Sequence, residues 1–251
     1  MRDRPGWWGM SPTAARMAEW VAARTAARSA PLRAVAAGAA VLVMLTLPAC
    51  APRPTLTLGS RGPAVVTLQQ RLAQLGYDLG SANGVFGDDT RHAVVAFQKV
   101  NALHRNGVVD PGTWAALDRP YIPRAHYNPY VRGQYVTGLE VDLSHQVLYR
   151  TYRGAVTGII DASTGDGRPG LPYSYTPPGS YTIYRINSVG WENGQLGALY
   201  KPAYFDGGYA VHGAISVPPY PASHGCVRTT VAARDRLTPW LRVGMPVAVY
   251  T

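Results

Sequence analysis

Apolar residues recur at spacings of three and four between residues 55 and 118, which is the period of an amphipathic helix. One stripe consists of Val65, Leu68, Leu72 and Leu75. A second consists of Ala93, Val94 and Phe97, in a helix expected to end near Leu103. Trp114 and Leu117, three residues apart, would fill the core from a third helix. The pattern predicts a module of three short helices.

Residues that favour turns and caps mark the ends of these helices. Gly76 is expected to end the first helix, and Asp88 or Asp89 to cap the second. Asp110 stands at the N-cap of the third helix. Pro111 follows at the first helical position, where its missing N–H is not needed.

Beyond residue 134 the hydrophobic period changes to that of short β-strands. We expect strands at residues 135–142, 146–153, 155–162, 180–187, 209–212 and 246–250. Turn signals rich in Gly, Pro and Asp separate them, and only residues 231–241 have a helical pattern. Residues 134–251 are therefore predicted to form a mainly β domain, a sandwich or barrel. Residues 119–133 contain three prolines and no hydrophobic period, which predicts a linker.

The first fifty residues have the layout of a secretory signal. Arginine-rich sequence precedes the apolar run 34–47, which is shorter than the ~20 residues of a membrane span. Leu47-Pro48-Ala49-Cys50 follows and resembles the lipobox of bacterial lipoproteins, from which Pro48 departs. We expect export, with Cys50 lipidated and the protein held at the outer face of the cytoplasmic membrane. Cleavage after Ala49 and an uncleaved anchor remain alternatives.

Composition and charge narrow the class of protein. A hydrophobic content of 47% and a charged content of 15% fit a packed globular chain. The net charge is +10, of which six arginines and two acidic residues before Leu47 supply +4. The remaining charge of about +6 is dispersed without a Lys/Arg run, whereas nucleic-acid binding needs a clustered basic face. We therefore expect no nucleic-acid partner, and an anionic wall polymer suits the charge better.

The chemistry concentrates around Cys226, one of two cysteines in the chain. A thiol with an ordinary pKa of ~8.5 needs a nearby base or cation to act as a nucleophile at neutral pH. His212, at the end of a predicted strand, and His224, two residues before the cysteine, are both candidates. Gly225 suits a tight turn in which the N–H groups of Gly225 and Cys226 face a developing oxyanion. Arg228 is placed to hold a carboxylate or to fix the loop.

Three other readings of this segment are weaker. Cys226 could be inert packing, but His, Gly and Arg surround it. A zinc site from His212, His224 and Cys226 lacks the usual close ligand pairs, so we expect no metal and no cofactor. Ser223 has no nucleophile-elbow motif around it, which favours a hydrogen-bonding role in the loop.

The helical segment resembles the peptidoglycan-binding domain found beside many wall enzymes. The matching residues are Leu68-Gln69, Leu75-Gly76-Tyr77, Gly84-Val85-Phe86-Gly87, Thr90, Ala93-Val94, Phe97-Gln98, Gly107-Val108-Val109 and Thr113-Trp114. The resemblance implies that this module tethers the enzyme to wall polymer. A purely structural spacer is the alternative.

The segment 135–250 resembles the L,D-transpeptidases of the YkuD family. The resemblance rests on His212-Gly213 and on Ser223-His224-Gly225-Cys226-Val227-Arg228. Further matches are Gln146-Val147-Leu148-Tyr149, Ala162-Ser163-Thr164-Gly165, Thr176 to Ile183 and Gly244-Met245-Pro246-Val247. The resemblance implies a YkuD-type β-sandwich preceded by the three-helix module.

The resemblance also implies an activity and residue roles. Cys226 would attack the carbonyl of the third residue of a peptidoglycan stem, expel the terminal D-Ala and pass the acyl group to a neighbouring amine, giving a 3→3 cross-link in cell-wall biogenesis. His212 would be the base, with its far ring nitrogen held by a carbonyl near Gly213. His224, Gly225 and Cys226 would form the oxyanion site, and Arg228 would support the loop. Tyr204 would line the substrate site.

The expected partners are peptidoglycan stem peptides and glycan, and carbapenem-type inhibitors. The stretch between His212 and Ser223 is short and no long lid precedes it, which predicts an open cleft. The open cleft leaves the balance between transfer and hydrolysis undecided, so an L,D-carboxypeptidase or other wall cysteine peptidase is one alternative. An inactive wall-binding scaffold is an alternative of another class.

Overall fold

The computed structural model describes residues 52–126, 137–169, 174–194 and 196–251. The predicted signal sequence lies outside the described residues, and so does the predicted lipidation site, Cys50. Much of the predicted linker also lies outside them. Within the described ranges, none of the helices combines the length and apolar character that crossing a membrane requires.

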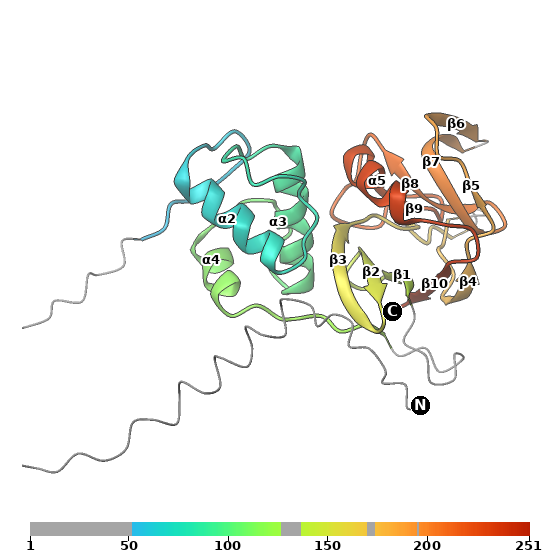
Figure 1. The fold of residues 1–251 in the computed structure, drawn as a ribbon, viewed down its shortest axis with the longest axis horizontal. Helices are drawn as coiled ribbons and strands as arrows, with labels where there is room; N and C mark the ends of the chain where they lie inside the picture. Colours follow the sequence, from blue (N-terminus) through green and yellow to red (C-terminus); the bar gives the residue numbers. More distant parts are fainter. Residues whose placement is uncertain (1–51, 127–136, 170–173, 195) are drawn as a thin grey trace, which may run out of the picture. The chain divides into compact units, whose positions relative to one another are not determined.

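The N-terminal part contains the three predicted helices (Figure 1): α2 (Pro63–Gln74), α3 (Asp88–Val100) and α4 (Pro111–Asp118). Asp110 caps α4, since its carboxylate accepts a 2.7 Å hydrogen bond from the N–H of Thr113. Gly76 follows α2 with a φ of 85°, a conformation that glycine adopts without strain. The cap predicted for α3 was wrong: Gly87 is its N-cap. Asp88 and Asp89 lie in its first turn, where they complement the helix dipole.

The C-terminal part is β-rich, as predicted. Its strands are β1 (Gly138–Asp142), β2 (Val147–Tyr152), β3 (Ala155–Asp161), β4 (Gly179–Thr182), β5 (Arg185–Ile186), β6 (Trp191–Gly194), β7 (Gly197–Asp206), β8 (Tyr209–Ala214), β9 (Val227–Thr230) and β10 (Pro246–Tyr250). A short helix, α5 (Val231–Leu237), and a 3₁₀ turn (Thr238–Trp240) follow β9.

The strands form two sheets in the described part of the chain. One has the order β3-β2-β1-β10-β4, and the other has the order β5-β7-β8-β9, with β6 paired to β7. The pairs β1–β10 and β8–β9 are parallel, whereas the other neighbours are antiparallel. Apolar side chains from both sheets share one core, which includes Leu139, Val141, Leu148, Ala203, Phe205, Val211, Val227, Val247 and Val249. This arrangement confirms the predicted β-sandwich.

Three features of the β domain differ from the sequence prediction. The single strand expected at 180–187 is divided into β4 and β5, which belong to different sheets, with the buried Ile183 between them. The strands β6, β7 and β9 were not predicted, because β7 contains Pro202 and an irregular register and β9 has only four residues. The helix predicted to Leu241 ends at Leu237, and Pro239 lies in the 3₁₀ turn that follows.

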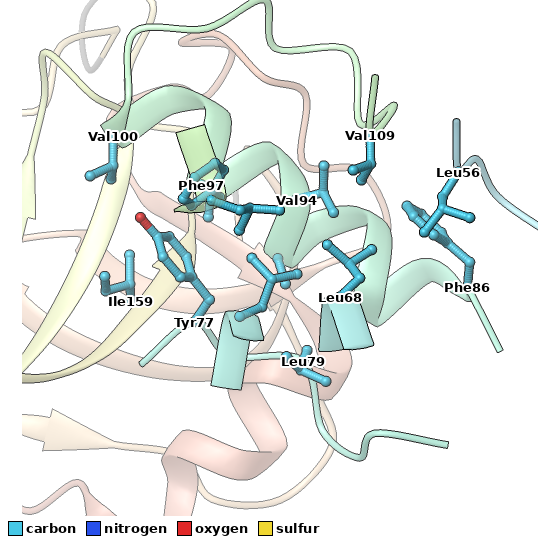
Figure 2. Close-up of a cluster of buried hydrophobic side chains, with 14 of the residues drawn as sticks. Leu56, Leu68, Tyr77, Leu79, Phe86, Val94, Phe97, Val100, Val109 and Ile159 are labelled. Atoms are coloured by element: carbon cyan, nitrogen blue, oxygen red, sulfur yellow. The ribbon is translucent and has the colours of Figure 1, made fainter. Parts of the chain in front are cut away.

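The helices and the sheets belong to one compact unit, Ala51–Thr251. One hydrophobic cluster contains side chains from both, as Figure 2 shows for Tyr77, Phe97 and Val100 beside Ile159. The backbone continues the contact, because the N–H of Asp78 donates to the carbonyl of Ile159 and the N–H of Ile159 donates to that of Gly76. The helical module thus packs directly against the outer strand β3.

Candidate active site

The parallel strands β8 and β9 bring the two predicted catalytic side chains together. Val211 pairs with Val227 and His212 pairs with Arg228. Because side chains alternate along a strand, the two valines enter the core while His212 and Arg228 share the opposite face. Cys226 immediately precedes β9 and continues the face of Arg228, which places it one diagonal step from His212 across the pair.

These side chains open into a cavity of about 580 Å³. It is lined by six of the predicted site residues: Cys226, His212, Ser223, His224, Arg228 and Tyr204. The β6–β7 hairpin also lines it, with Trp191 and Leu196, as does Ile215 beyond β8. The sequence did not indicate this hairpin as strands, and the expectation of an open cleft stays a prediction.

His212 is held as a neutral base. Its imidazole is 5% exposed, and Nδ1 lies 2.8 Å from the carbonyl oxygen of Gly213, as the resemblance implied. A carbonyl only accepts, so Nδ1 carries the proton and Nε2 has a free lone pair. Burial lowers the pKa of His212 to about 4, and the positive charges of Arg228 and Arg234 act in the same direction. The ring is neutral at physiological pH.

Cys226 is partly buried, and burial raises the pKa of its thiol above the ordinary value. A backbone hydrogen bond from Ala210 and the charge of Arg228 lower that pKa and offset part of the shift. Cys226 Sγ also lies 3.8 Å from the carbonyl oxygen of Gly208, to which the S–H donates. The resting site thus contains a neutral thiol and a neutral imidazole.

The loop before the cysteine is closed by Ser223. Its hydroxyl donates to the carbonyl of Cys226 at 2.5 Å and accepts from the N–H of Gly225 at 3.0 Å. The N–H of Gly225 is therefore occupied, which narrows the predicted oxyanion donors to the amides of His224 and Cys226. This hydrogen bonding gives Ser223 the loop role expected for it.

Two glycines permit the close packing of the site. Gly225 has a φ of 110°, and a Cβ there would lie 2.2 Å from the ring of Tyr209. A Cβ on Gly213 would lie 2.9 Å from the Tyr200 ring and 3.1 Å from the Cα of Val231. Neither position accommodates a larger residue without movement of its surroundings.

Arg228 and Tyr204 differ in what holds them. The backbone of Arg228 exchanges two hydrogen bonds with Ser163, at 2.9 and 3.0 Å, so its main chain anchors the loop, and the residue also lines the cavity. The hydroxyl of Tyr204 donates to Glu192 at 2.8 Å, and Arg185 stacks over the ring at 4.0 Å. Burial and the bond to Glu192 raise the pKa of Tyr204 to about 12.

Several supporting residues were not singled out from the sequence. Thr176 accepts from the N–H of Gly165 and donates to the carbonyl of Gly225, and Glu192 fixes Tyr204. Thr176 stands in a segment that matched the family, but its hydrogen-bond partners are 11 and 49 residues away in sequence. Among the described residues, no group of three His, Cys, Asp or Glu side chains could hold a metal ion, and the zinc set considered above is not assembled.

Comparisons with known proteins gave matches for both parts of the chain. Residues 61–117 match the family described as putative peptidoglycan binding domain, and residues 137–249 match the L,D-transpeptidase catalytic domain, YkuD. The crystal structure of an L,D-transpeptidase from Xylanimonas cellulosilytica is 43% identical, covers 78% of this chain and 97% of its own, and has a TM-score of 0.70. An L,D-transpeptidase structure from Stackebrandtia nassauensis is 23% identical, covers 78% of this chain and 95% of its own, and has a TM-score of 0.45.

A curated relative from Bacillus licheniformis, described as a probable N-acetylmuramoyl-L-alanine amidase, is 32% identical over 126 residues. The match covers 44% of this chain and 35% of that protein, so the chain spans about a third of its curated relative. The two matched segments, and the likeness along nearly the whole Xylanimonas structure, show that this chain belongs to the L,D-transpeptidase (YkuD) family and has an N-terminal peptidoglycan-binding domain.

Proposed function

We propose that this protein forms 3→3 cross-links in peptidoglycan through a thioacyl-enzyme intermediate on Cys226. The observation that carries the proposal is the pair formed by Cys226 and His212 in one cavity, with Nδ1 of His212 committed to the carbonyl of Gly213. Nε2 is then the ring nitrogen able to take a proton from the thiol.

In the first half-reaction Cys226 Sγ attacks the carbonyl carbon of the third stem residue. The thiol proton passes to Nε2 of His212, and the backbone N–H groups of His224 and Cys226 stabilise the oxyanion. The C–N bond to the terminal D-Ala then breaks, and the imidazolium returns its proton to the departing amine. A thioester on Cys226 remains.

In the second half-reaction the side-chain amine of a diamino acid on another stem attacks the thioester. Its proton passes to His212, the C–S bond breaks, and the sulfur is reprotonated. The new amide is the cross-link. Water in place of the amine would give a carboxypeptidase, which the same residues support.

The proposed substrate and the N-terminal sequence both support a location at the outer face of the cytoplasmic membrane. Peptidoglycan is assembled outside the cytoplasmic membrane, and the N-terminal sequence supports export with lipidation at Cys50 as the anchor. The peptidoglycan-binding domain supports contact with wall polymer. Carbapenem-type β-lactams, whose strained carbonyl meets the same nucleophile, are proposed inhibitors.

The test uses the mature chain and a disaccharide-tetrapeptide substrate. Mass spectrometry should show a cross-linked dimer and released D-Ala, whereas a tripeptide product alone would identify a carboxypeptidase. Intact mass after exposure to meropenem should show one adduct on the wild type and none on Cys226→Ala, with much slower labelling of His212→Ala. An adduct that persists in Cys226→Ala would refute the proposed nucleophile, and a protein with neither product nor adduct would be a scaffold.

A further inference from the structure

A buried lysine joins the helical module to the catalytic domain. Lys99, in the last turn of α3, is 0% exposed. Its ammonium donates to Oδ1 of Asp161 at 2.6 Å and to the carbonyl oxygens of Ala162 and Gln146 at 2.8 and 2.9 Å. Three donors thus meet three acceptors, all contributed by the catalytic domain. Full pairing is what allows a charge to be buried at an interface.

The residues that Lys99 holds lead directly to the catalytic loop. Ala162–Gly165, which we call the strap, connects the end of β3 to Asp166, whose N–H donates to the carbonyl of Ser223 at 3.1 Å. Within the strap, Ser163 exchanges two backbone hydrogen bonds with Arg228. The carbonyl of Thr164 accepts from the N–H groups of Ala222 and Ser223, both at 2.9 Å. The strap therefore supports the loop on both sides of the nucleophile.

Gln146 connects the strap to Lys99 a second time. Its side chain donates to Oγ1 of Thr164 at 2.7 Å and accepts from the N–H of Thr164 at 2.9 Å. Its own carbonyl is one of the acceptors of Lys99. All of these groups are buried, so water does not substitute for a lost hydrogen bond at low cost.

The rest of the interface fixes the module without touching the strap. Arg236 of α5 forms hydrogen bonds with the carboxylates of Asp78 and Asp89, at distances from 2.6 to 3.2 Å. The second oxygen of Asp161 lies 2.6 Å from Nδ1 of His92, another α3 residue. The shared hydrophobic cluster of Figure 2 adds apolar contact.

We infer that Lys99 is a positioning residue of the active site, and that the helical module completes the enzyme in addition to any tethering. Lys99 fixes the strap, the strap fixes residues 222–228, and that loop fixes the sulfur. The inference rests on the proposed function only in taking Cys226 as the nucleophile.

The test compares two interface variants of the mature chain. Lys99→Met keeps an unbranched apolar side chain, one atom shorter than that of lysine, and removes the ammonium. Arg236→Gln removes the ion pairs with Asp78 and Asp89, which belong to the same interface and do not touch the strap. Both are assayed by the saturation kinetics of meropenem acylation, at a temperature where circular dichroism shows each variant folded. Lys99→Met should lower the limiting acylation rate by about 10–100-fold with little change in the half-saturating concentration, because small misplacements of a reacting atom are costly. Arg236→Gln should stay within about twofold of wild type even where its Tm falls.

Thr164→Val provides a second route to the same question. It removes the hydroxyl that Gln146 binds while leaving the ammonium of Lys99 in place. If Lys99→Met does not fold, this variant tests whether the strap positions the active site. It should also slow acylation, and combined with Lys99→Met the effects should be less than additive because both act through the strap.

The outcomes separate the inference from the proposed function. A wild-type rate in Lys99→Met or, if that variant is unfolded, in Thr164→Val overturns the positioning role. Equal slowing in Arg236→Gln and Lys99→Met also overturns it, because general loosening of the interface would then explain both. Wild-type protein that gains no adduct on Cys226 refutes the proposed nucleophile itself.

Discussion

The pH dependence of Cys226 acylation gives a quantitative test of the site. Burial and two cations lower the pKa of His212 to about 4, against an unperturbed value of about 6.5. At pH 5 an imidazole with a pKa of about 4 is about 90% neutral, whereas one with a pKa of about 6.5 is about 3% neutral. At this pH the fraction of neutral imidazole therefore differs by roughly 30-fold between the two cases.

The assay follows the rate of adduct formation with meropenem between pH 4 and pH 8, by intact mass. The rate should be nearly flat from pH 8 to pH 5 and fall only as the pH approaches 4. His212→Ala, which lacks the base, should be slower by about 10²–10⁴-fold. An inflection near pH 6.5 in the wild type, absent from His212→Ala, would refute the structural account of a desolvated neutral histidine.

The lowered pKa of His212 also predicts how the stability of the fold depends on pH, which is an independent measurement. The folded pKa of His212 lies below its unfolded value, so the unfolded chain takes up the proton first as the pH falls. The contribution of the neutral His212 ring to the free energy of unfolding is complete above about pH 6.5. It is lost between about pH 6.5 and pH 4, and the total loss is about 3 kcal/mol for a pKa shift of this size. Denaturant unfolding should show this loss in the wild type and a smaller one in His212→Ala.

Two further substitutions test the surroundings of the site, and a third tests a buried carboxylate of β1. Gly225→Ala would place a methyl group 2.2 Å from the Tyr209 ring, so acylation should fall by more than about 100-fold; near-wild-type labelling would contradict the packing described for this loop. Thr176→Val removes two hydrogen bonds of a buried hydroxyl and should lower the free energy of unfolding by about 1–3 kcal/mol, measured by urea titration. An unchanged urea midpoint would show that these hydrogen bonds contribute little to the stability of the fold. Glu140 is buried, and burial raises its pKa to about 7, so its stabilisation of the fold is present below about pH 4.5 and lost as the pH rises through 7. Glu140→Gln should therefore have the higher Tm at pH 8 and lose that advantage near pH 5, and equal melting at both values would exclude the shift.

The fold could be predicted from the sequence where a local pattern sufficed. The four-residue spacing of Leu68 and Leu72 and the three-residue spacing of Val94 and Phe97 identified helices, and Asp110 with Pro111 marked the start of α4. The alternation in Val247 and Val249 identified β10. Prediction failed where neighbours in space supply the pattern: Ile183 divides a run that looked continuous, because the two sheets it joins share a core.

In the active site, too, local sequence predicted the residue types, whereas contacts distant in sequence decided their surroundings. The residue types around Cys226 indicated a nucleophile, and the resemblance indicated that His212 is its base. The hydrogen bond from Gly225 to Ser223, which removes one predicted oxyanion donor, depends on the path of the loop. The hairpin that walls the cavity pairs Trp191 with Tyr200, and no local period revealed it.

The sequence by itself determined the helical module, the β class of the second domain and the candidate site residues, because these depend on side-chain type and short spacing. The tertiary structure decided which groups are desolvated and what lies next to them. It placed His212 among cations in a buried site, gave Lys99 its three acceptors, and packed the helices against β3. Charge state and position depend on burial and on contacts distant in sequence, and these arise only when the chain folds.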